Sequence, residues 1–137
     1  MGTLNLELSG TKLEMEIKDY EKHDWVSCTF HVHSDFISYD LVDDETLEAA
    51  DIDYLVKQLK KLLAGELRER EEISFTEPFL EFTLWPGTKD YEPSVDWKFI
   101  LWEDPNQVFT GNYFSLQLGD DDIRKLVGYL EEVMKSV

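Results

Sequence analysis

The chain has 137 residues, of which 42% are hydrophobic and 13% aromatic, and its 30 acidic and 13 basic side chains give a formal net charge of −17. This composition argues against a disordered chain and predicts one domain, residues 1–137, with a hydrophobic core. The charge argues against nucleic acids and anionic membranes as partners, because both are bound through clustered lysines and arginines.

The acidity allows two interpretations: it keeps the protein in solution, or it steers a basic partner toward the surface. Cys28 is the one cysteine, so no disulfide can form within the chain. Residues 1–10 show no basic segment followed by an apolar run, and no run is long enough to span a bilayer. We therefore expect a cytoplasmic protein.

A β-hairpin is predicted near the N-terminus. Leu4–Leu8 and Leu13–Ile17 alternate between apolar and polar residues, and Ser9–Lys12 between them has the composition of a turn. The residues expected to face the core are Leu4, Leu6, Leu8, Leu13, Met15 and Ile17.

Trp25–Val32 predicts a third strand, and Phe36–Val42 a fourth. Alternation in the third strand places Val26, Cys28, Phe30 and Val32 on one face, with His31 and His33 opposite. Zinc would need a third and a fourth ligand, for which His23 and a carboxylate are candidates. We expect exposed strand histidines rather than a metal site.

An amphipathic helix follows, with apolar residues at the 3.6-residue period. Its apolar stripe consists of Ile52, Leu55, Val56, Leu59, Leu62 and Leu63. Lysines gather toward its end and Gly65 is suited to stop it, which matches the helix dipole and a glycine C-cap.

Between Phe36 and Val56 the chain carries an acidic run without any lysine or arginine. The run consists of Asp40, Asp43, Asp44, Glu45, Glu48, Asp51 and Asp53. We expect a loop and a helix start here. Two interpretations stay open: a solvated face, or a binding surface for a basic partner.

Four further strands and a second helix are predicted in the C-terminal half. The strand segments are 72–75, 79–85, 95–102 and 113–118, with a loop at 103–112. Asp120 is the expected N-cap of a helix with its apolar stripe at Ile123, Leu126, Val127, Leu130, Val133 and Met134. The order and the short connections predict an α+β fold: a mainly antiparallel, twisted sheet packed on one face by two amphipathic helices.

Three apolar residues in these strands have the parity opposite to the core face: Trp85, Ile100 and Trp102. Aromatic anchors surrounded by acids would suit a protein interface, so Trp85 and Trp102 are candidate partner-binding residues together with the acidic run. The alternative is that a helix covers them.

Glu77 and Pro78 interrupt a strand-forming stretch. Ile73 and Phe75 are apolar at odd positions, whereas Leu80 and Phe82 are apolar at even positions, so the alternation slips by one residue. Proline is tolerated at a bulge or a strand break. We therefore assign Glu77 and Pro78 a structural role, the alternative being a positioned acid near a groove.

The sequence shows no catalytic set. Cys28 has core parity, and Asp120–Asp122 suit the first turn of a helix, where the dipole favours acids. No glycine-rich phosphate loop, nucleophile elbow or paired zinc motif is present, so we expect neither catalysis nor a cofactor. The alternative is a small cytosolic enzyme or ligand-binding domain whose sheet-lined pocket uses Glu77, Glu81 or the histidines.

The segment Phe75–Leu84, with its pattern F-x-E-P-x-L-x-F-x-L, resembles immunity proteins of the WapI type. Asp24 and Trp25 resemble that family's early aspartate–tryptophan strand, Asp51–Gly65 its helix, and Tyr113–Val133 its closing strand and helix. The resemblance covers most of residues 3–135. It implies a bacterial cytoplasmic protein that binds and neutralises a cognate toxin domain without catalysis; it does not identify the toxin or the oligomeric state.

Overall fold

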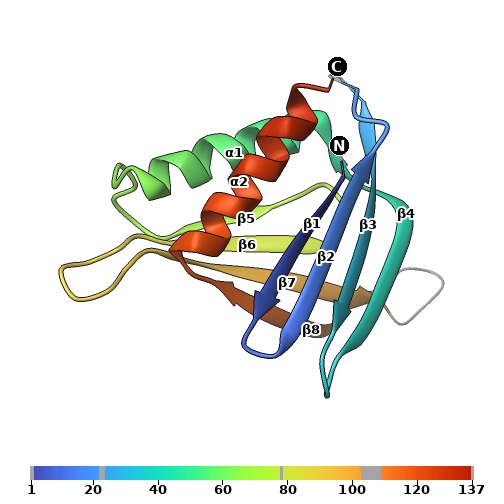
Figure 1. Cartoon of the computed structure of the whole chain (residues 1–137), viewed down its shortest axis with the longest axis horizontal. Helices are drawn as coiled ribbons and strands as arrows, with labels where there is room; N and C mark the ends of the chain where they lie inside the picture. Colours follow the sequence, from blue (N-terminus) through green and yellow to red (C-terminus); the bar gives the residue numbers. More distant parts are fainter. Residues whose placement is uncertain (1, 22–23, 78, 103–108, 137) are drawn as a thin grey trace.

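The computed structural model describes residues 2–21, 24–77, 79–102 and 109–136 (Figure 1). In chain order the elements are β1 (Thr3–Leu8), β2 (Thr11–Lys18), β3 (Trp25–His33), β4 (Ser38–Glu48), α1 (Ala49–Leu63), β5 (Glu71–Ser74), β6 (Leu80–Trp85), β7 (Ser94–Trp102), β8 (Phe109–Leu118) and α2 (Asp120–Met134). Within the described ranges, neither helix combines the length and apolar composition needed to cross a membrane.

The α+β class and the antiparallel pairing are confirmed, but the strands form two sheets where the sequence suggested one. The orders are β1-β2-β3-β4 and β5-β6-β7-β8, and every pairing is antiparallel. Helix α1 intervenes between β4 and β5, so the chain leaves the first sheet before the second begins. Each sheet is then completed by hairpin connections between neighbouring strands.

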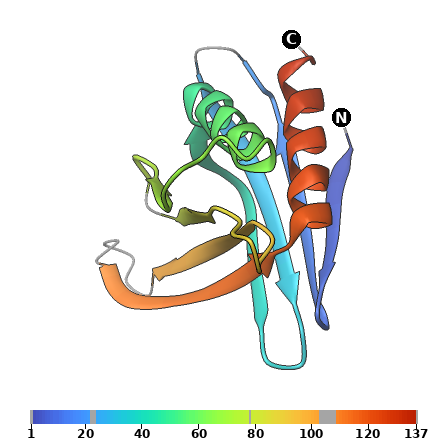
Figure 2. The same cartoon turned by 90° about the vertical axis from the view of Figure 1, so that its left-hand side faces the viewer.

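The two sheets and two helices share one hydrophobic core. In Figure 1 the strands of the two sheets run in clearly different directions, and Figure 2 shows α1 and α2 next to each other. Helix α1 contacts β4 and β6, while α2 contacts β1, β7 and β8, so each helix covers parts of both sheets. Phe30 of β3 joins the sheets directly, with its ring centroid 6.1 Å from Trp97 and 5.6 Å from Phe99 of β7.

The first hairpin forms as the alternation predicts. Leu8 pairs with Thr11, so Ser9 and Gly10 make a two-residue turn, with φ values of 50° and 89°. Positive φ at both positions gives the turn whose twist matches the flanking strands. The expected core-facing residues are buried except Leu8, which is only partly buried at the end of its strand.

Strand β4 is longer than predicted and corrects the structure expected for the acidic run. Instead of a loop, Asp43–Glu45 belong to a strand that pairs with β3 as far as Trp25 opposite Glu48. A register shift and a positive φ of 49° at Asp43 mark a bulge within it. The extended backbone persists because it has a full pairing partner in β3, and an edge strand tolerates charged side chains.

Both helices have clear ends. Glu48 is the N-cap of α1, its N–H donates to Asp51 Oδ2 at 2.9 Å, and the two residues form a capping box. Gly65, with φ of 74°, follows the helix as predicted. Helix α2 differs by one residue from expectation: Gly119 is the N-cap, and Asp120 is the first helical residue.

The interrupted stretch at Glu77 is a hairpin connection. Strands β5 and β6 pair antiparallel, with Ile73 opposite Phe82, and residues 75–79 join them. Phe75 and Leu80 both reach the core, as the slip in alternation predicts. Pro78 itself lies outside the described residues, so its structural role stays a prediction.

A candidate partner-binding surface on the first sheet

Strand β4 forms an edge of the first sheet, because β3 alone pairs with it among the residues that the structure describes (Figure 1). An edge strand leaves a row of backbone N–H and C=O groups without partners in the sheet. The acidic run contains seven candidate partner-binding residues. Four of them lie on this edge, ahead of the residue that caps helix α1: Asp40, Asp43, Asp44 and Glu45. The structure therefore places much of the run on an accessible border of the molecule.

The turn between β3 and β4 presents an aromatic side chain that the sequence analysis placed at a strand start. Phe36 is 97% exposed. The turn is ordered by Ser34, whose Oγ accepts the N–H of Phe36 at 3.1 Å and that of Ile37 at 3.0 Å. Ser34 and Asp35 are turn-forming residues, and that composition was the signal that Phe36 sits at a tip. Further along the same edge, Val42 is 61% exposed.

Two acids of β4 bind to neighbours on the outer face of the sheet. Asp40 Oδ1 contacts His31 Nδ1 and lies 2.8 Å from His33 Nε2. The hydrogen bond with His31, and then that with His33, lowers the pKa of the Asp40 carboxyl. Asp43 accepts from the Thr29 hydroxyl at 3.3 Å and lies 3.4 Å from Lys18 Nζ.

The last three acids of the run, beginning with Glu48 at the end of β4, serve helix α1. Glu48 and Asp51 form the capping box, and Asp53 pairs with Lys57 at 3.0 Å, one helical turn away. Among the described residues, Asp44 and Glu45 form no ion pair. Of the two, Glu45 is exposed, whereas Asp44 is half-buried opposite Cys28 in the register.

Trp85 is not brought to the acidic strand. It lies at the end of β6 in the second sheet, 40% exposed, with its Nε1 donating to Asp96 Oδ2 at 2.8 Å. The Arg70 guanidinium stacks 5.3 Å from its ring centroid. Trp102 belongs to β7, but its side chain is outside what the structure describes. The aromatic anchors and the acids therefore occupy different sheets.

Ile100 was expected to add exposed apolar surface, and this is wrong: it is 5% exposed. Its N–H donates to the carbonyl of Phe79 at 2.9 Å, so the β5–β6 connection lies beside it. A register shift between Ile100 and Trp102 also breaks the simple alternation of β7. Up to Ile100, however, the register is regular, with Ile100 opposite Tyr113, so the residue keeps its predicted face and is buried there beside the segment that precedes β6.

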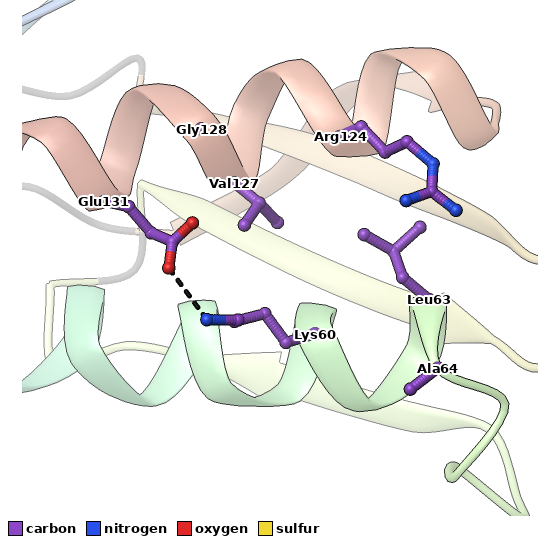
Figure 3. Close-up of a pocket in the computed structure, with 7 residues that line it drawn as sticks. All are labelled: Lys60, Leu63, Ala64, Arg124, Val127, Gly128 and Glu131. Carbon is purple, nitrogen blue, oxygen red and sulfur yellow. Dashed lines mark hydrogen bonds and ion pairs between the residues drawn. The ribbon is translucent and has the colours of Figure 1, made fainter.

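A groove of about 410 Å³ separates the two helices (Figure 3). Leu63 and Val127 point into it from opposite sides, and the Lys60–Glu131 ion pair of 2.8 Å bridges it. Gly128 lines the same groove on α2. The groove presents apolar side chains with one ionic bridge, and no reactive group points into it among the residues drawn.

The residues considered for a sheet-lined pocket do not converge. Glu81 lies on β6 and pairs with Lys98 at 3.3 Å, whereas His31 and His33 belong to the other sheet. His23 lies outside the described residues. Cys28 is fully buried, and desolvation raises its pKa to about 11, so it is a core thiol rather than a nucleophile.

The sequence was compared with family models, with curated proteins and with solved structures. The model of the immunity protein WapI-like family matches residues 4–137. No curated protein and no solved structure matches the chain.

Proposed function

This chain belongs to the WapI-like family of immunity proteins, and we propose that it neutralises a cognate toxin domain by stoichiometric binding in the bacterial cytoplasm. The observation that carries this proposal is the family match along residues 4–137. Binding, rather than catalysis, also suits the arrangement described above, because the candidate nucleophile is buried and the acids and histidines considered for catalysis lie on different sheets.

We place the binding surface on what we term the β4 edge: Phe36, Val42, Asp44 and Glu45. Phe36 and Val42 are the exposed apolar groups of this border, and a projecting aromatic ring is the type of side chain that anchors protein interfaces. Burial of the Phe36 ring by the toxin would mainly slow dissociation.

The charge of the molecule supports a basic toxin surface as the partner. With a net charge of −17 and carboxylates along the β4 edge, the field would steer a cationic domain toward it. Steering of this kind raises association rates by ~10-fold or more at low salt. We assign this steering to Asp44 and Glu45, because the other acids of the run form ion pairs, hydrogen bonds or helix caps within the chain.

The same features oppose self-association. A bulge at Asp43 and acidic side chains along the strand interfere with pairing between two copies of β4, since like charges would face each other. A basic partner would not meet this repulsion. The β4 edge is therefore suited to discriminate a cationic domain from a second copy of the chain.

The test requires the toxin domain encoded beside this chain's gene, at the C-terminal end of a long secreted protein. Co-expression with the chain should restore growth of cells that produce the toxin domain, and the purified proteins should form a stoichiometric complex. Phe36→Ala should weaken binding at least ~30-fold, the size expected for loss of an interface anchor, chiefly through faster dissociation. Failure of the wild-type chain to bind or protect would contradict the proposed function.

The surface assignment has its own controls. Asp44→Lys/Glu45→Lys should slow association at low salt, whereas Asp90→Lys/Glu92→Lys changes the net charge equally on the β6–β7 connection and should not. Tyr113→Ala removes an aromatic ring that is 56% exposed on β8 and serves as the match for Phe36→Ala. If only the control variants weakened binding, the toxin would bind the second sheet instead.

A further inference from the structure

The outer face of the first sheet brings two histidines and a carboxylate to one point. His31 and His33 are two residues apart on β3, so their side chains share a face, and their rings stack with centroids 6.4 Å apart. Asp40 lies directly opposite His31 on β4. Its Oδ1 contacts both rings, at His31 Nδ1 and, 2.8 Å away, at His33 Nε2. The backbone register, rather than a flexible loop, sets this arrangement.

The three atoms have the spacing of a metal site. One ring nitrogen of each histidine and one Asp40 oxygen all lie within 4.8 Å of one another. Tetrahedral zinc with bonds of ~2.0–2.2 Å separates its ligand atoms by ~3.3 Å. Small side-chain rotations would open the contacts to that spacing, because all three groups sit at the surface with freedom to adjust. A cation would then replace the protons that the rings now direct at the carboxylate.

The neighbours of His33 orient its ring so that Nε2 faces Asp40. Its Nδ1 lies 3.3 Å from the Ser38 hydroxyl, which leaves Nε2 directed at Asp40. A hydrogen bond to the second ring nitrogen is the usual way in which a protein orients a metal-binding histidine. On the other side of His31, Glu14 of β2 is its register partner, and both border a surface hollow of about 430 Å³. The hollow gives space for water or another oxygen ligand.

From this geometry we propose that His31, His33 and Asp40 form a zinc-binding site on the outer face of the first sheet. Two imidazole nitrogens and one carboxylate oxygen suit a borderline divalent ion, whereas Mg²⁺ and Ca²⁺ prefer ligand sets made of oxygen. The three protein ligands leave a fourth position open to solvent. This site is independent of the proposed toxin binding, because it is defined by residues apart from Phe36, Val42, Asp44 and Glu45.

Isothermal titration of the full-length protein with ZnCl₂ tests the proposal directly. Wild type should bind one equivalent of Zn²⁺ saturably, and its melting temperature should rise with the Zn²⁺ concentration by mass action. His31→Gln, His33→Gln and Asp40→Asn should each weaken binding ~10-fold or more, while circular dichroism stays unchanged because the residues are at the surface. Ser38→Ala should weaken binding less, since it removes only the orienting hydroxyl.

Asp121→Asn is the matched control, because it makes the same carboxylate-to-amide change at an exposed position in the first turn of α2. It should bind Zn²⁺ like wild type. A parallel titration with MgCl₂ measures diffuse attraction of cations to the acidic surface and should show no saturable binding. The proposal is overturned if Zn²⁺ does not saturate at one equivalent, if Asp40→Asn binds as tightly as wild type, or if Mg²⁺ binds equally well.

Discussion

On β3, neighbouring residues lie in opposite environments. Val26, Cys28, Phe30 and Val32 are completely inaccessible, whereas His33 is exposed on the other face. The period of two in a strand produces this separation, and it places a thiol in the core within one residue of the outer surface. The environment, rather than the residue type, therefore decides the chemistry of Cys28.

Burial of Cys28 should make the free energy of unfolding fall at alkaline pH. Desolvation raises the thiol pKa from 9.0 to about 11, so the folded state holds the proton more tightly than the unfolded state. Its contribution is present below pH 9 and is lost progressively between pH 9 and 11. Over that interval the free energy of unfolding of wild type should fall more steeply than that of Cys28→Ala, by up to ~1.4 kcal/mol per pH unit.

Urea denaturation at a series of pH values measures both slopes. Cys28→Ala should itself be less stable at neutral pH, because it leaves a small cavity, but that loss does not depend on pH. Parallel pH profiles for the two proteins would show that the thiol does not titrate differently in the folded state.

At the scale of elements, strand β4 passes directly into helix α1. Glu48 ends the strand and caps the helix, so one residue belongs functionally to both. Asp51 closes the junction by accepting the Glu48 N–H, which would otherwise lack a partner in the first turn. The charge pattern alone suggests that the acidic run forms one uniform surface. The structure shows that two of its acids, Glu48 and Asp51, cap a helix instead.

Asp51 should matter more for stability than its neighbour Asp53. Asp51→Ala removes the accepting carboxylate of the capping box and should cost ~0.5–2 kcal/mol. Asp53→Ala removes an exposed ion pair with Lys57 and should cost ~0.5 kcal/mol or less. Thermal or chemical denaturation of both variants compares them; equal losses would mean that the capping box contributes nothing beyond surface charge.

Two glycines on or beside helices should respond oppositely to alanine. No atom lies within 4 Å of a Cβ added at Gly128, in the middle of α2, so Gly128→Ala should stabilise the protein by ~0.5–1 kcal/mol. Gly65 has φ of 74°, so Gly65→Ala should destabilise by ~1–2 kcal/mol although it also has space. Denaturation curves give both signs, and destabilisation by Gly128→Ala would indicate that α2 packs more closely there than described.

At the scale of the whole molecule, aromatic side chains hold the two sheets together. Phe30 meets Trp97 and Phe99, and Tyr39 of β4 meets Phe99 and Phe114 at centroid distances of 5.5 and 5.4 Å. These rings come from both halves of the chain, on either side of α1. Neither sheet can bury its aromatic face without the other, so we expect the halves to depend on each other for stability.

Phe30→Ala should destabilise the chain by ~3–5 kcal/mol, because it removes a fully buried ring and leaves a cavity between the sheets. Wild type should unfold in a single step, with tryptophan fluorescence and far-ultraviolet circular dichroism giving the same midpoint. The fluorescence comes from both sheets, with Trp25 on β3 and Trp85, Trp97 and Trp102 on β6 and β7, while the dichroism signal reports on all elements. Separate midpoints would indicate that the chain does not form the single domain predicted from its length.

The sequence by itself determined the order of the strands and helices and most of their core faces, since the period of two and the period of 3.6 residues are local properties. It missed the start of β8, which begins at Phe109 within the expected loop 103–112. It located the first turn within Ser9–Lys12 and the end of α1 at Gly65, because their chemistry acts within a few residues. The tertiary structure alone decided that there are two sheets, that β4 continues from Asp43 to Glu48 as an edge strand, and that Ile100 is buried. It also supplied Asp40 as the partner of His31 and His33. These outcomes depend on strand register and on contacts between distant segments, which no local pattern of residues encodes.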